Sequence, residues 1–315
     1  MTTKTTLTPG TMPISLLPPK VDIVFKMLFG DERNIDDLKK FLSAVLHLGT
    51  GELAEVFLTD THLKQEYLED KLGVLDVKAK LANGKVLDIE MQVRSVPEMR
   101  HRITYYNAAM ITGQIGESGK YIDIKPAISI IITNYPLITE SKKCHTRFRT
   151  LEVDEHFPFN DLQEINILDL TKIALETDDK LLGWLKFISS ETEEDFMAVA
   201  ANYPEISNAL NSLKVISADA INRERYENRL KAQRDIWSIE DAAKVKGHAE
   251  GHAEGHAEGH AEGHAEGHAE GHAEGEANAL QNFLQLLNSG LSVEEIKAKL
   301  VQTNQNITTK QVSKS

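Results

Sequence analysis

The stretch VLDVKAKLANGKVLDIEMQV, residues 74–93, decides the fold of this chain. Aliphatic residues alternate with charged ones on both sides of an Asn-Gly pair, which predicts two strands joined by a tight turn. A two-residue loop at Asn83-Gly84 would place Glu90 opposite Val77 and mix carboxylates with apolar side chains on both faces. A three-residue loop that adds Ala82, with Gly84 in the left-handed conformation, separates the two kinds of side chain. We therefore predict the three-residue loop.

In this register one face of the hairpin is apolar and the other is polar. Asp76 lies opposite Glu90, and Lys78 lies opposite Asp88. The apolar face consists of Leu75, Val77, Ala79, Leu81, Leu87, Ile89, Met91 and Val93. The polar face consists of Asp76, Lys78, Lys80, Asp88, Glu90 and Gln92.

The facing acids of the hairpin indicate a metal site. Two carboxylates directly across a strand pair repel each other unless a cation lies between them. Asp76 and Glu90 therefore suggest a site for a hard divalent ion such as Mg²⁺, with the backbone carbonyl of Met91 as a third ligand. The alternative is a solvated face whose charges are balanced by Lys78 and Lys80.

The surrounding pattern predicts an α/β fold. Apolar residues recur at helical spacing from Val21, and Asn34 and Gly49 are the expected cap and stop of a second helix. Strand signals follow at residues 55–63, in the hairpin, and in the β-branched run 126–133, whose composition suits a strand buried on both faces. A long helix with Pro97 near its first turn separates the hairpin from the run 126–133. This order predicts a mixed sheet flanked by helices.

Length and cysteine content restrict the class of protein. A chain of 315 residues with 41% apolar content can form one sizeable core with appendages, and we expect one main domain with tails. The single cysteine, Cys144, excludes an internal disulfide framework. The sequence has neither a signal-peptide core nor an apolar segment long enough to cross a bilayer. These features predict a cytoplasmic protein without a membrane partner.

The charge is distributed unevenly along the chain. The net charge of −13 argues against a nucleic-acid partner, because phosphate binding depends on Lys and Arg. However, residues 1–150 hold 20 basic and 18 acidic residues, whereas residues 151–315 hold 15 and 30. The first half could therefore bind DNA through a local basic surface.

The hairpin and its neighbours resemble a known family. An acid on one strand, a short turn, and then Glu-x-Gln, here DVKAK followed by DIEMQ, resembles a variant of the PD-(D/E)XK nuclease pattern, whose usual ending is Glu-x-Lys. This variant is found in the Rpn family of recombination-promoting nucleases and transposases. DIVFKMLFG, RHRITYYNAAMITGQIGESGKY, and the Gly-and-Glu tetrapeptides before LLNSGLSVEEIKAKL follow in that family's order. The resemblance covers roughly residues 20–300.

The resemblance implies a Mg²⁺-dependent DNA endonuclease with a restriction-endonuclease-like core, acting in recombination or in a transposase-like role. Carried over to this sequence, it makes Asp76 and Glu90 the metal ligands and Asp22 an accessory acid. Gln92 takes the position of the usual catalytic lysine but cannot supply its positive charge, and Lys78 on the same face is the candidate to compensate. The expected DNA contacts are Arg102 and Lys80. Arg102 could instead cap or salt-bridge the sheet, and Asp22 could serve the dipole of its helix.

The C-terminal region contains a perfect repeat, GHAE, which occurs seven times from Gly247 to Glu274. Glycine at every fourth position and Glu beside Glu at i,i+4 disfavour an isolated helix, whereas two packed segments would be favoured by close backbone approach. We interpret the repeat as a spacer or self-association arm, and binding of a transition metal by i,i+4 histidines is the less favoured alternative. The tail after it predicts two short helices broken at Ser289-Gly290, with a capping box at Ser292 and Glu295.

These interpretations divide the chain into six segments and leave two functions open. The segments are a disordered N-terminus (1–19), a nuclease-like core (20–175), a helical extension (176–246), the repeat (247–276), a helical hairpin (277–301) and a disordered tail (302–315). The chain is expected to be either an endonuclease or a catalytically weakened DNA-binding protein that self-assembles through the repeat and the C-terminal helices.

Overall fold

The structure is a computed structural model and describes residues 15–49, 51–59, 76–116, 119–176 and 178–299. These residues form two units, which divide after Ile236. Residues 1–14 and 302–315, most of the segments predicted to be disordered, lie outside the described residues, as do Leu75 and the end of the strand predicted at 55–63.

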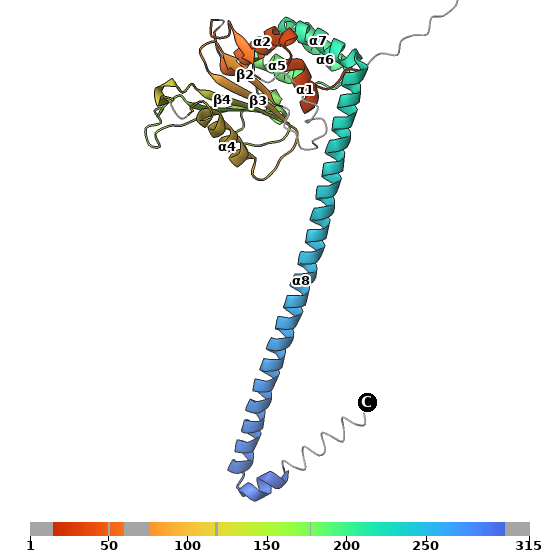
Figure 1. Cartoon of the computed structure of the whole chain (residues 1–315). Helices are drawn as coiled ribbons and strands as arrows, with labels where there is room; N and C mark the ends of the chain where they lie inside the picture. The colour runs from red at the N-terminus through yellow and green to blue at the C-terminus, as the bar shows by residue number, and fades with distance from the viewer. Residues whose placement is uncertain (1–14, 50, 60–75, 117–118, 177, 300–315) are drawn as a thin grey trace, which may run out of the picture. The chain divides into compact units, whose positions relative to one another are not determined.

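The described part of the first unit is built around a six-stranded mixed sheet (Figure 1). The strands are β1 (Val56–Leu58), β2 (Val77–Leu81), β3 (Val86–Gln92), β4 (Ala127–Thr133), β5 (His145–Arg149) and β6 (Gln163–Asp169). Their order across the sheet is β1-β2-β3-β4-β6-β5. Strands β3, β4 and β6 are parallel, and the remaining neighbours are antiparallel. The predicted α/β class with a mixed sheet is confirmed.

Helices of the first unit lie on both faces of this sheet. The α-helices labelled in the described residues are α1 (Asp22–Phe29), α2 (Ile35–Leu46), α4 (Met99–Thr112), α5 (Asp179–Ser189), α6 (Glu193–Asn202), α7 (Ser207–Ala218) and α8 (Ala220–Asn288), the last of which continues into the second unit. Short 3-10 turns occupy Glu32–Asn34, Tyr121–Asp123, Leu170–Leu175 and Pro204–Ile206. The helical character predicted for residues 178–245 is confirmed.

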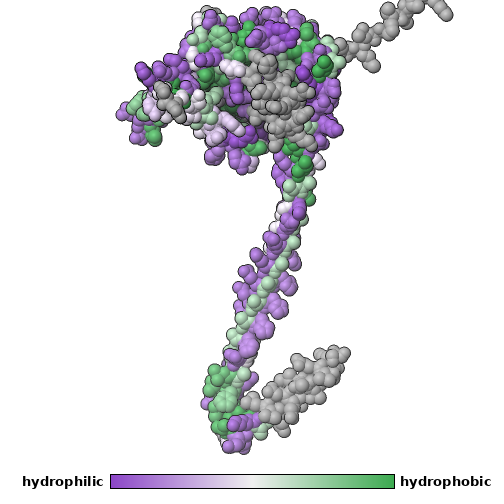
Figure 2. Space-filling view, in the orientation of Figure 1, coloured by the Kyte–Doolittle hydropathy of each residue, from purple (hydrophilic) through white to green (hydrophobic). Residues whose placement is uncertain are grey.

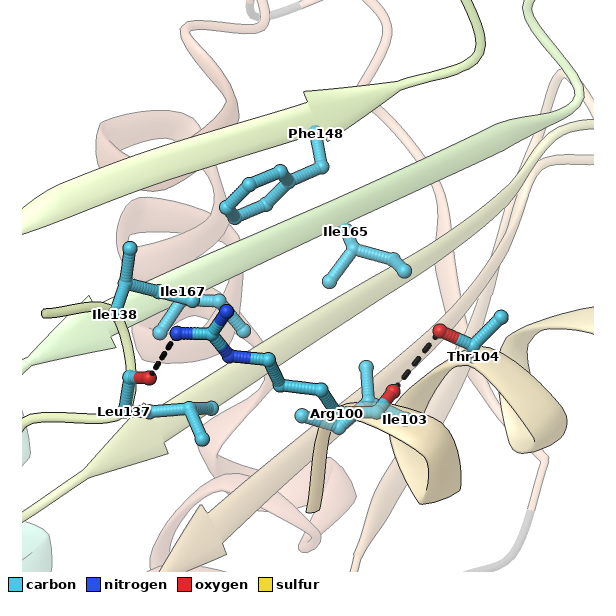
Figure 3. A pocket seen from close by; sticks show the side chains of 8 residues that line it. All are labelled: Arg100, Ile103, Thr104, Leu137, Ile138, Phe148, Ile165 and Ile167. Atoms are coloured by element: carbon cyan, nitrogen blue, oxygen red, sulfur yellow. Dashed lines mark hydrogen bonds between the residues drawn. The ribbon is translucent and has the colours of Figure 1, made fainter. Parts of the chain in front are cut away.

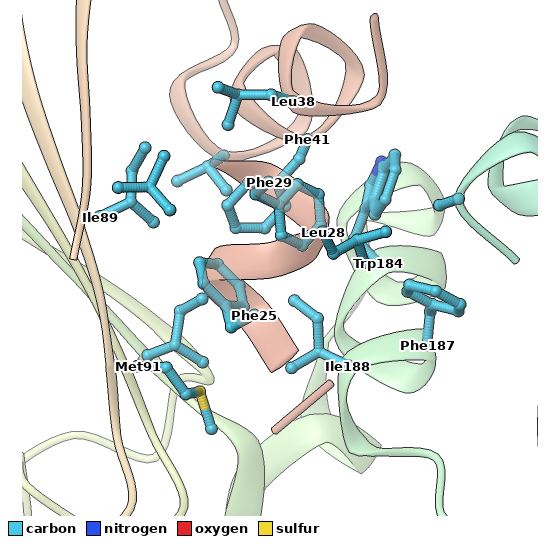
Figure 4. Close-up of a cluster of buried hydrophobic side chains, with 14 of the residues drawn as sticks. Phe25, Leu28, Phe29, Leu38, Phe41, Ile89, Met91, Trp184, Phe187 and Ile188 are labelled. Carbon is cyan, nitrogen blue, oxygen red and sulfur yellow. The ribbon is translucent and has the colours of Figure 1, made fainter. Parts of the chain in front are cut away.

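The larger core lies between one face of the sheet and helices α1, α2 and α5 to α7. Figure 4 shows its centre, where the rings of Phe29 and Phe41 contact Trp184 and the ring of Phe25 packs against both phenylalanines. Trp184 is 1% exposed, and the rings of Phe29 and Trp184 have centroids 5.8 Å apart. Burying large rings in this way supplies most of the driving force for folding. This core covers the sheet face opposite to the polar side chains of the hairpin.

The hairpin has the predicted register. Val77 pairs with Ile89, Lys78 with Asp88, and Ala79 with Leu87. Gly84 has φ +88°, the left-handed conformation that the three-residue loop requires. The three-residue loop, which was predicted from the separation of apolar and polar side chains, is therefore confirmed.

Replacing Gly84 by alanine is expected to destabilise the fold. A Cβ atom there would lie 2.8 Å from Cγ of Lys125, and a side chain disfavours positive φ. We expect the free energy of unfolding, measured by urea denaturation, to fall by about 1–2 kcal/mol. Gly51→Ala is the matched control, because an added Cβ meets no atom within 4 Å there. An equal loss in both variants would contradict the turn assignment.

Asn34 is the N-cap residue of α2, as predicted, but its side-chain hydrogen bonds and the C-terminal end of the helix differ from the prediction. Asn34 does not cap α2 with its side chain; its amide donates to the carbonyl of Leu28 (2.9 Å) and accepts from the Ser212 hydroxyl (2.8 Å). The helix ends at His47, with φ +53°, before Gly49 is reached. Tertiary hydrogen bonds therefore use the side chain that local sequence assigns to a cap.

The predicted N-terminal boundary also differs in detail. Leu16 and Leu17 fall within the segment expected to be disordered, yet both are buried in the larger core. The backbone N–H of Leu17 donates to the hydroxyl of Ser217 at 2.9 Å. Apolar side chains at this end of the segment gain more from burial than they lose in chain entropy.

The second unit, Trp237 onward, begins within α8. This helix runs without a break through the predicted segment boundaries at 246 and 276 as far as Asn288. Gly290, with φ +80°, follows it in a turn, and residues 293–299 are helical. The predicted break and capping box are confirmed, since Ser292 and Glu295 exchange reciprocal hydrogen bonds of 2.8 Å and 3.4 Å.

Candidate active site

Three carboxylates share one face of the sheet at strands β2 and β3. Asp76 directly precedes β2, and Asp88 and Glu90 alternate on β3. Glu90 pairs with Ile131, which belongs to the apolar cluster under α4. Paired residues project to the same side of a sheet, so these acids lie on the α4 side, opposite the larger core.

Asp76 is held from two directions. The Lys26 ammonium, on α1, donates to the backbone carbonyl of Asp76 at 2.8 Å. The Lys78 ammonium lies 3.1 Å from Oδ2 of the Asp76 carboxylate. Lys78 also lies opposite Asp88 in the strand pair, as predicted, and its charge acts on both carboxylates. The arrangement places a cation next to the first candidate metal ligand.

Asp88 is the acid that the sequence interpretation left out of the site. It is 8% exposed, and its Oδ1 has no hydrogen-bond partner among the described residues. Burial, the charge of Asp76 and hydrogen bonding with that carboxyl raise the pKa of Asp88 to about 8. The alternation of DIE in the sequence already put Asp88 on the polar face, so a signal for it was present.

Glu90 and Gln92 act as a pair on the same strand. The Gln92 side-chain amide donates to Oε1 of Glu90. Burial and the charge of Asp76 raise the pKa of Glu90, whereas Arg102 and the Gln92 hydrogen bond oppose the rise. Gln92 therefore orients Glu90, which a neutral amide can do although it supplies no charge.

Arg102 on α4 faces the same group of acids. Its charge favours the ionised form of Glu90, and its guanidinium carbon lies 6.0 Å from the centre of the Tyr106 ring. Tyr135 adjoins both: burial and the charge of Glu90 raise its pKa to about 12, and Arg102 opposes this. The Tyr135 hydroxyl is buried without a hydrogen-bond partner among the described residues. Arg102 is thus near enough to the site to act on a bound anion.

The other predicted site residues, Lys80, Met91 and Asp22, lie in three different environments. Lys80 is exposed on β2, two residues beyond Lys78 on the same face. The Met91 side chain is 3% exposed in the larger core, so only its backbone carbonyl is suited to meet an ion. Asp22 on α1 is bound by the Arg229 guanidinium, with contacts of 2.5 and 3.0 Å to Oδ2.

The donor set fits a hard divalent cation. Two acids with raised pKa values and an unpartnered buried carboxylate oxygen mark a position where negative charge is poorly compensated. Within the described ranges no group of three or more His, Cys, Asp or Glu side chains has the arrangement of a complete metal cage. Mg²⁺ needs no such cage, because it retains several waters and takes only one or two carboxylates from the protein.

An apolar pocket of about 200 Å³ lies on the same side of the sheet, between α4 and strands β5 and β6 (Figure 3). Ile103, Phe148 and Ile165 line it, and the Arg100 guanidinium beside it donates to the Leu137 carbonyl at 2.8 Å. Its lining is apolar apart from Arg100 and Thr104, so it lacks the groups that the chemistry of the acids would need.

The model of one family, the PD-(D/E)XK nuclease family transposase, matches residues 19–243. The chain belongs to this family. The match confirms the resemblance seen in the sequence and covers the PD-(D/E)XK hairpin together with α1 and α4. Neither the curated proteins nor the solved structures contain a match to the chain. Family membership supports a nuclease or transposase-like role for this PD-(D/E)XK core.

No helix of the described residues combines the length and the apolar character needed to span a membrane.

We expect the stability of the native state to depend on pH because of the acids of this PD-(D/E)XK core. A group whose pKa is raised by folding binds its proton more tightly in the native state, so native stability falls as pH rises from about 4 to about 8. In EDTA, Asp88→Asn should remove up to about 1.4 kcal/mol of this fall per pH unit. Urea denaturation at pH 5 and pH 8 measures it, with exposed Asp161→Asn as control. Parallel curves for wild type and Asp88→Asn would contradict the assignment.

Proposed function

We propose that this chain is a divalent-metal-dependent DNA endonuclease that hydrolyses phosphodiester bonds in DNA recombination or in a transposase-like role. The observation that carries the proposal is the group of poorly compensated carboxylates, Asp76, Asp88 and Glu90, on one face of a PD-(D/E)XK sheet. Such a group costs stability and is retained where a cation binds. A cytoplasmic location accords with the absence of a disulfide framework in the sequence.

Asp76 and Glu90 would hold Mg²⁺, or another divalent ion, with the backbone carbonyl of Met91 as a third oxygen ligand. Asp88 adds a further carboxylate beside Asp76. When bound, the ion supplies Lewis acidity toward the scissile phosphate and lowers the pKa of a water. Asp22 would be an accessory acid, and it forms an ion pair with Arg229.

Lys78 and Gln92 would together replace the usual catalytic lysine. Gln92 fixes the orientation of Glu90 through its amide. Lys78 would supply the positive charge, because its ammonium lies beside the Asp76 carboxylate and its side chain is 47% exposed. Separating orientation from charge in this way explains how the family pattern tolerates a neutral Gln92.

Arg102 and Lys80 would contact the DNA backbone. Arg102 can bind a phosphate bidentately, and its charge already acts on Glu90. Lys80 is exposed on the polar face of β2 and would act as a point charge. Both belong to the half of the chain that is not acidic.

Cleavage of supercoiled plasmid tests the proposal. Purified full-length chain should nick plasmid in Mg²⁺ and not in EDTA, and Glu90→Gln should reduce the rate at least about 100-fold. Glu140→Gln, an exposed acid paired with Arg100, is the matched control and should cleave normally. Equal nicking by wild type and Glu90→Gln would reveal a contaminant. Full cleavage by Lys78→Ala would refute the compensating role of Lys78.

An alternative is a catalytically weakened protein that binds DNA and self-assembles on the same fold. Gln92 favours it, because the lysine of the common pattern is missing. The end of α8 carries exposed Leu280, Leu284 and Leu287 at helical spacing, which would suit packing against a second copy. Salt-dependent DNA binding without Mg²⁺-dependent cleavage, together with a doubled mass in solution, would support this alternative.

A further inference from the structure

The repeat forms part of a single solvent-exposed helix. Residues 247–276 lie within α8, and every one of them is exposed. Figure 2 shows this stretch as a largely hydrophilic surface with a pale strip of alanine. Seven of the twelve histidines of the chain occur here, at intervals of four residues. Neither the nuclease proposal nor the family match uses these side chains.

The helix turns the repeat into a ladder of adjacent imidazoles. Residues four apart are separated by about 6 Å along the axis and about 40° around it, so each histidine stands next to another. The rings of His268 and His272 have centroids 6.4 Å apart and planes 30° apart. Between neighbouring histidines, the positions three residues after the first and three residues before the second are glycine and alanine, which leave the space between the rings open.

We propose that adjacent histidines of this ladder bind borderline divalent transition metals, such as Zn²⁺ or Ni²⁺, with two imidazoles to each ion and up to three ions per chain. Imidazole nitrogen suits these metals, whereas Mg²⁺ prefers oxygen ligands. Within the GHAE repeat the glutamates stand two residues from each histidine, about 200° around the helix, so they do not complete an oxygen site. Just after the repeat, Oε1 of Glu276 lies 3.3 Å from Nδ1 of His272, so only this last histidine has a carboxylate beside it among the described residues of the ladder. Water would fill the remaining coordination positions, because the described residues place no group of three or more His, Cys, Asp or Glu side chains that could hold an ion.

Metal binding would be coupled to the helical state of the repeat. Glycine at every fourth position lowers helix propensity, and the exposed repeat gains nothing from packing within the described unit. An ion that requires two histidines four residues apart on a helix binds the helix and not the coil, so it shifts the equilibrium toward the helix. The chain would then carry two metal sites of different selectivity, an oxygen site in the core and a nitrogen ladder on α8.

Two variants of the full chain with the same number of histidines test whether metal binding depends on adjacent pairs or only on the number of histidines. In the first, His252→Gln, His260→Gln and His268→Gln leave four histidines spaced eight residues apart, so no adjacent pair remains. In the second, His264→Gln, His268→Gln and His272→Gln leave four consecutive repeat histidines and therefore two pairs. Each is titrated with Zn²⁺ at pH 8 in the presence of excess Mg²⁺, which occupies the carboxylate site.

The expected stoichiometries by calorimetry are about three Zn²⁺ per wild-type chain, two for the second variant and none for the first. Hydrogen exchange of residues 247–276 should slow at least several-fold on adding Zn²⁺ in the wild type and the second variant, and stay unchanged in the first. Equal binding by both variants, or no binding by the wild type, would overturn the proposal. Binding that occurs only with doubling of the mass would also overturn it, because the ions would then bridge two chains.

Discussion

Asp76→Asn is expected to abolish cleavage while stabilising the fold. Removing one of two carboxylate ligands should lower the rate of Mg²⁺-dependent plasmid cleavage by at least about 10³-fold. The same change removes a charge that raises the pKa of both Asp88 and Glu90. Relief of this repulsion should increase the free energy of unfolding by about 1–2 kcal/mol in EDTA at pH 8. Activity and stability therefore move in opposite directions.

The ion pair between Asp76 and Lys78 works against that gain, but only weakly. Lys78 is nearly half exposed, and pairs of this kind contribute little after solvent screening. Urea denaturation and plasmid cleavage on the same preparation measure both effects, and Glu140→Gln should change neither. Loss of cleavage together with loss of stability would mean that Asp76 is structural. Unchanged cleavage would remove it from the site altogether.

The sequence was sufficient for the hairpin because three local signals agree there. The Asn-Gly pair fixes the turn, the alternation fixes the face, and only one loop length separates carboxylates from apolar side chains. Pairing of Lys78 with Asp88 and the left-handed Gly84 follow from that choice. β4 was equally clear, since an unbroken β-branched run leaves no polar face, and every residue of that strand is buried.

Other features depend on partners that local sequence does not reveal. Strands β5 and β6 were not predicted, because β6 carries Glu164 and Asn166 where a buried strand normally has apolar residues. Arg147 and Arg149 of β5 satisfy Glu164 across the strand pair, so the polar pattern is stable only when both strands are present. Asp88 was left out of the predicted site for a related reason: its raised pKa arises from burial in the folded chain and from the charge of Asp76, which directly precedes β2.

Arg229→Met is expected to destabilise the first unit by about 3–5 kcal/mol. Asp22 is 8% exposed, and Arg229 binds it through two guanidinium nitrogens although the residues are 207 positions apart. Removing the arginine leaves a buried carboxylate without its counter-ion, which costs far more than the pair contributes. Urea denaturation measures the loss. Arg223→Met on the same helix is the control and should cost less than about 1 kcal/mol, because Arg223 donates to a backbone carbonyl.

The double variant Arg229→Met with Asp22→Asn distinguishes a structural Asp22 from an accessory acid. Neutralising both partners should restore most of the stability, since no unpaired charge stays buried. Lys26, one turn beyond Asp22 on α1, holds the backbone of Asp76, so a restored α1 should also restore the position of the first metal ligand. Recovery of stability and cleavage together would make Asp22 an anchor for α1. Recovery of stability without cleavage would show that the Asp22 carboxylate itself takes part in the reaction.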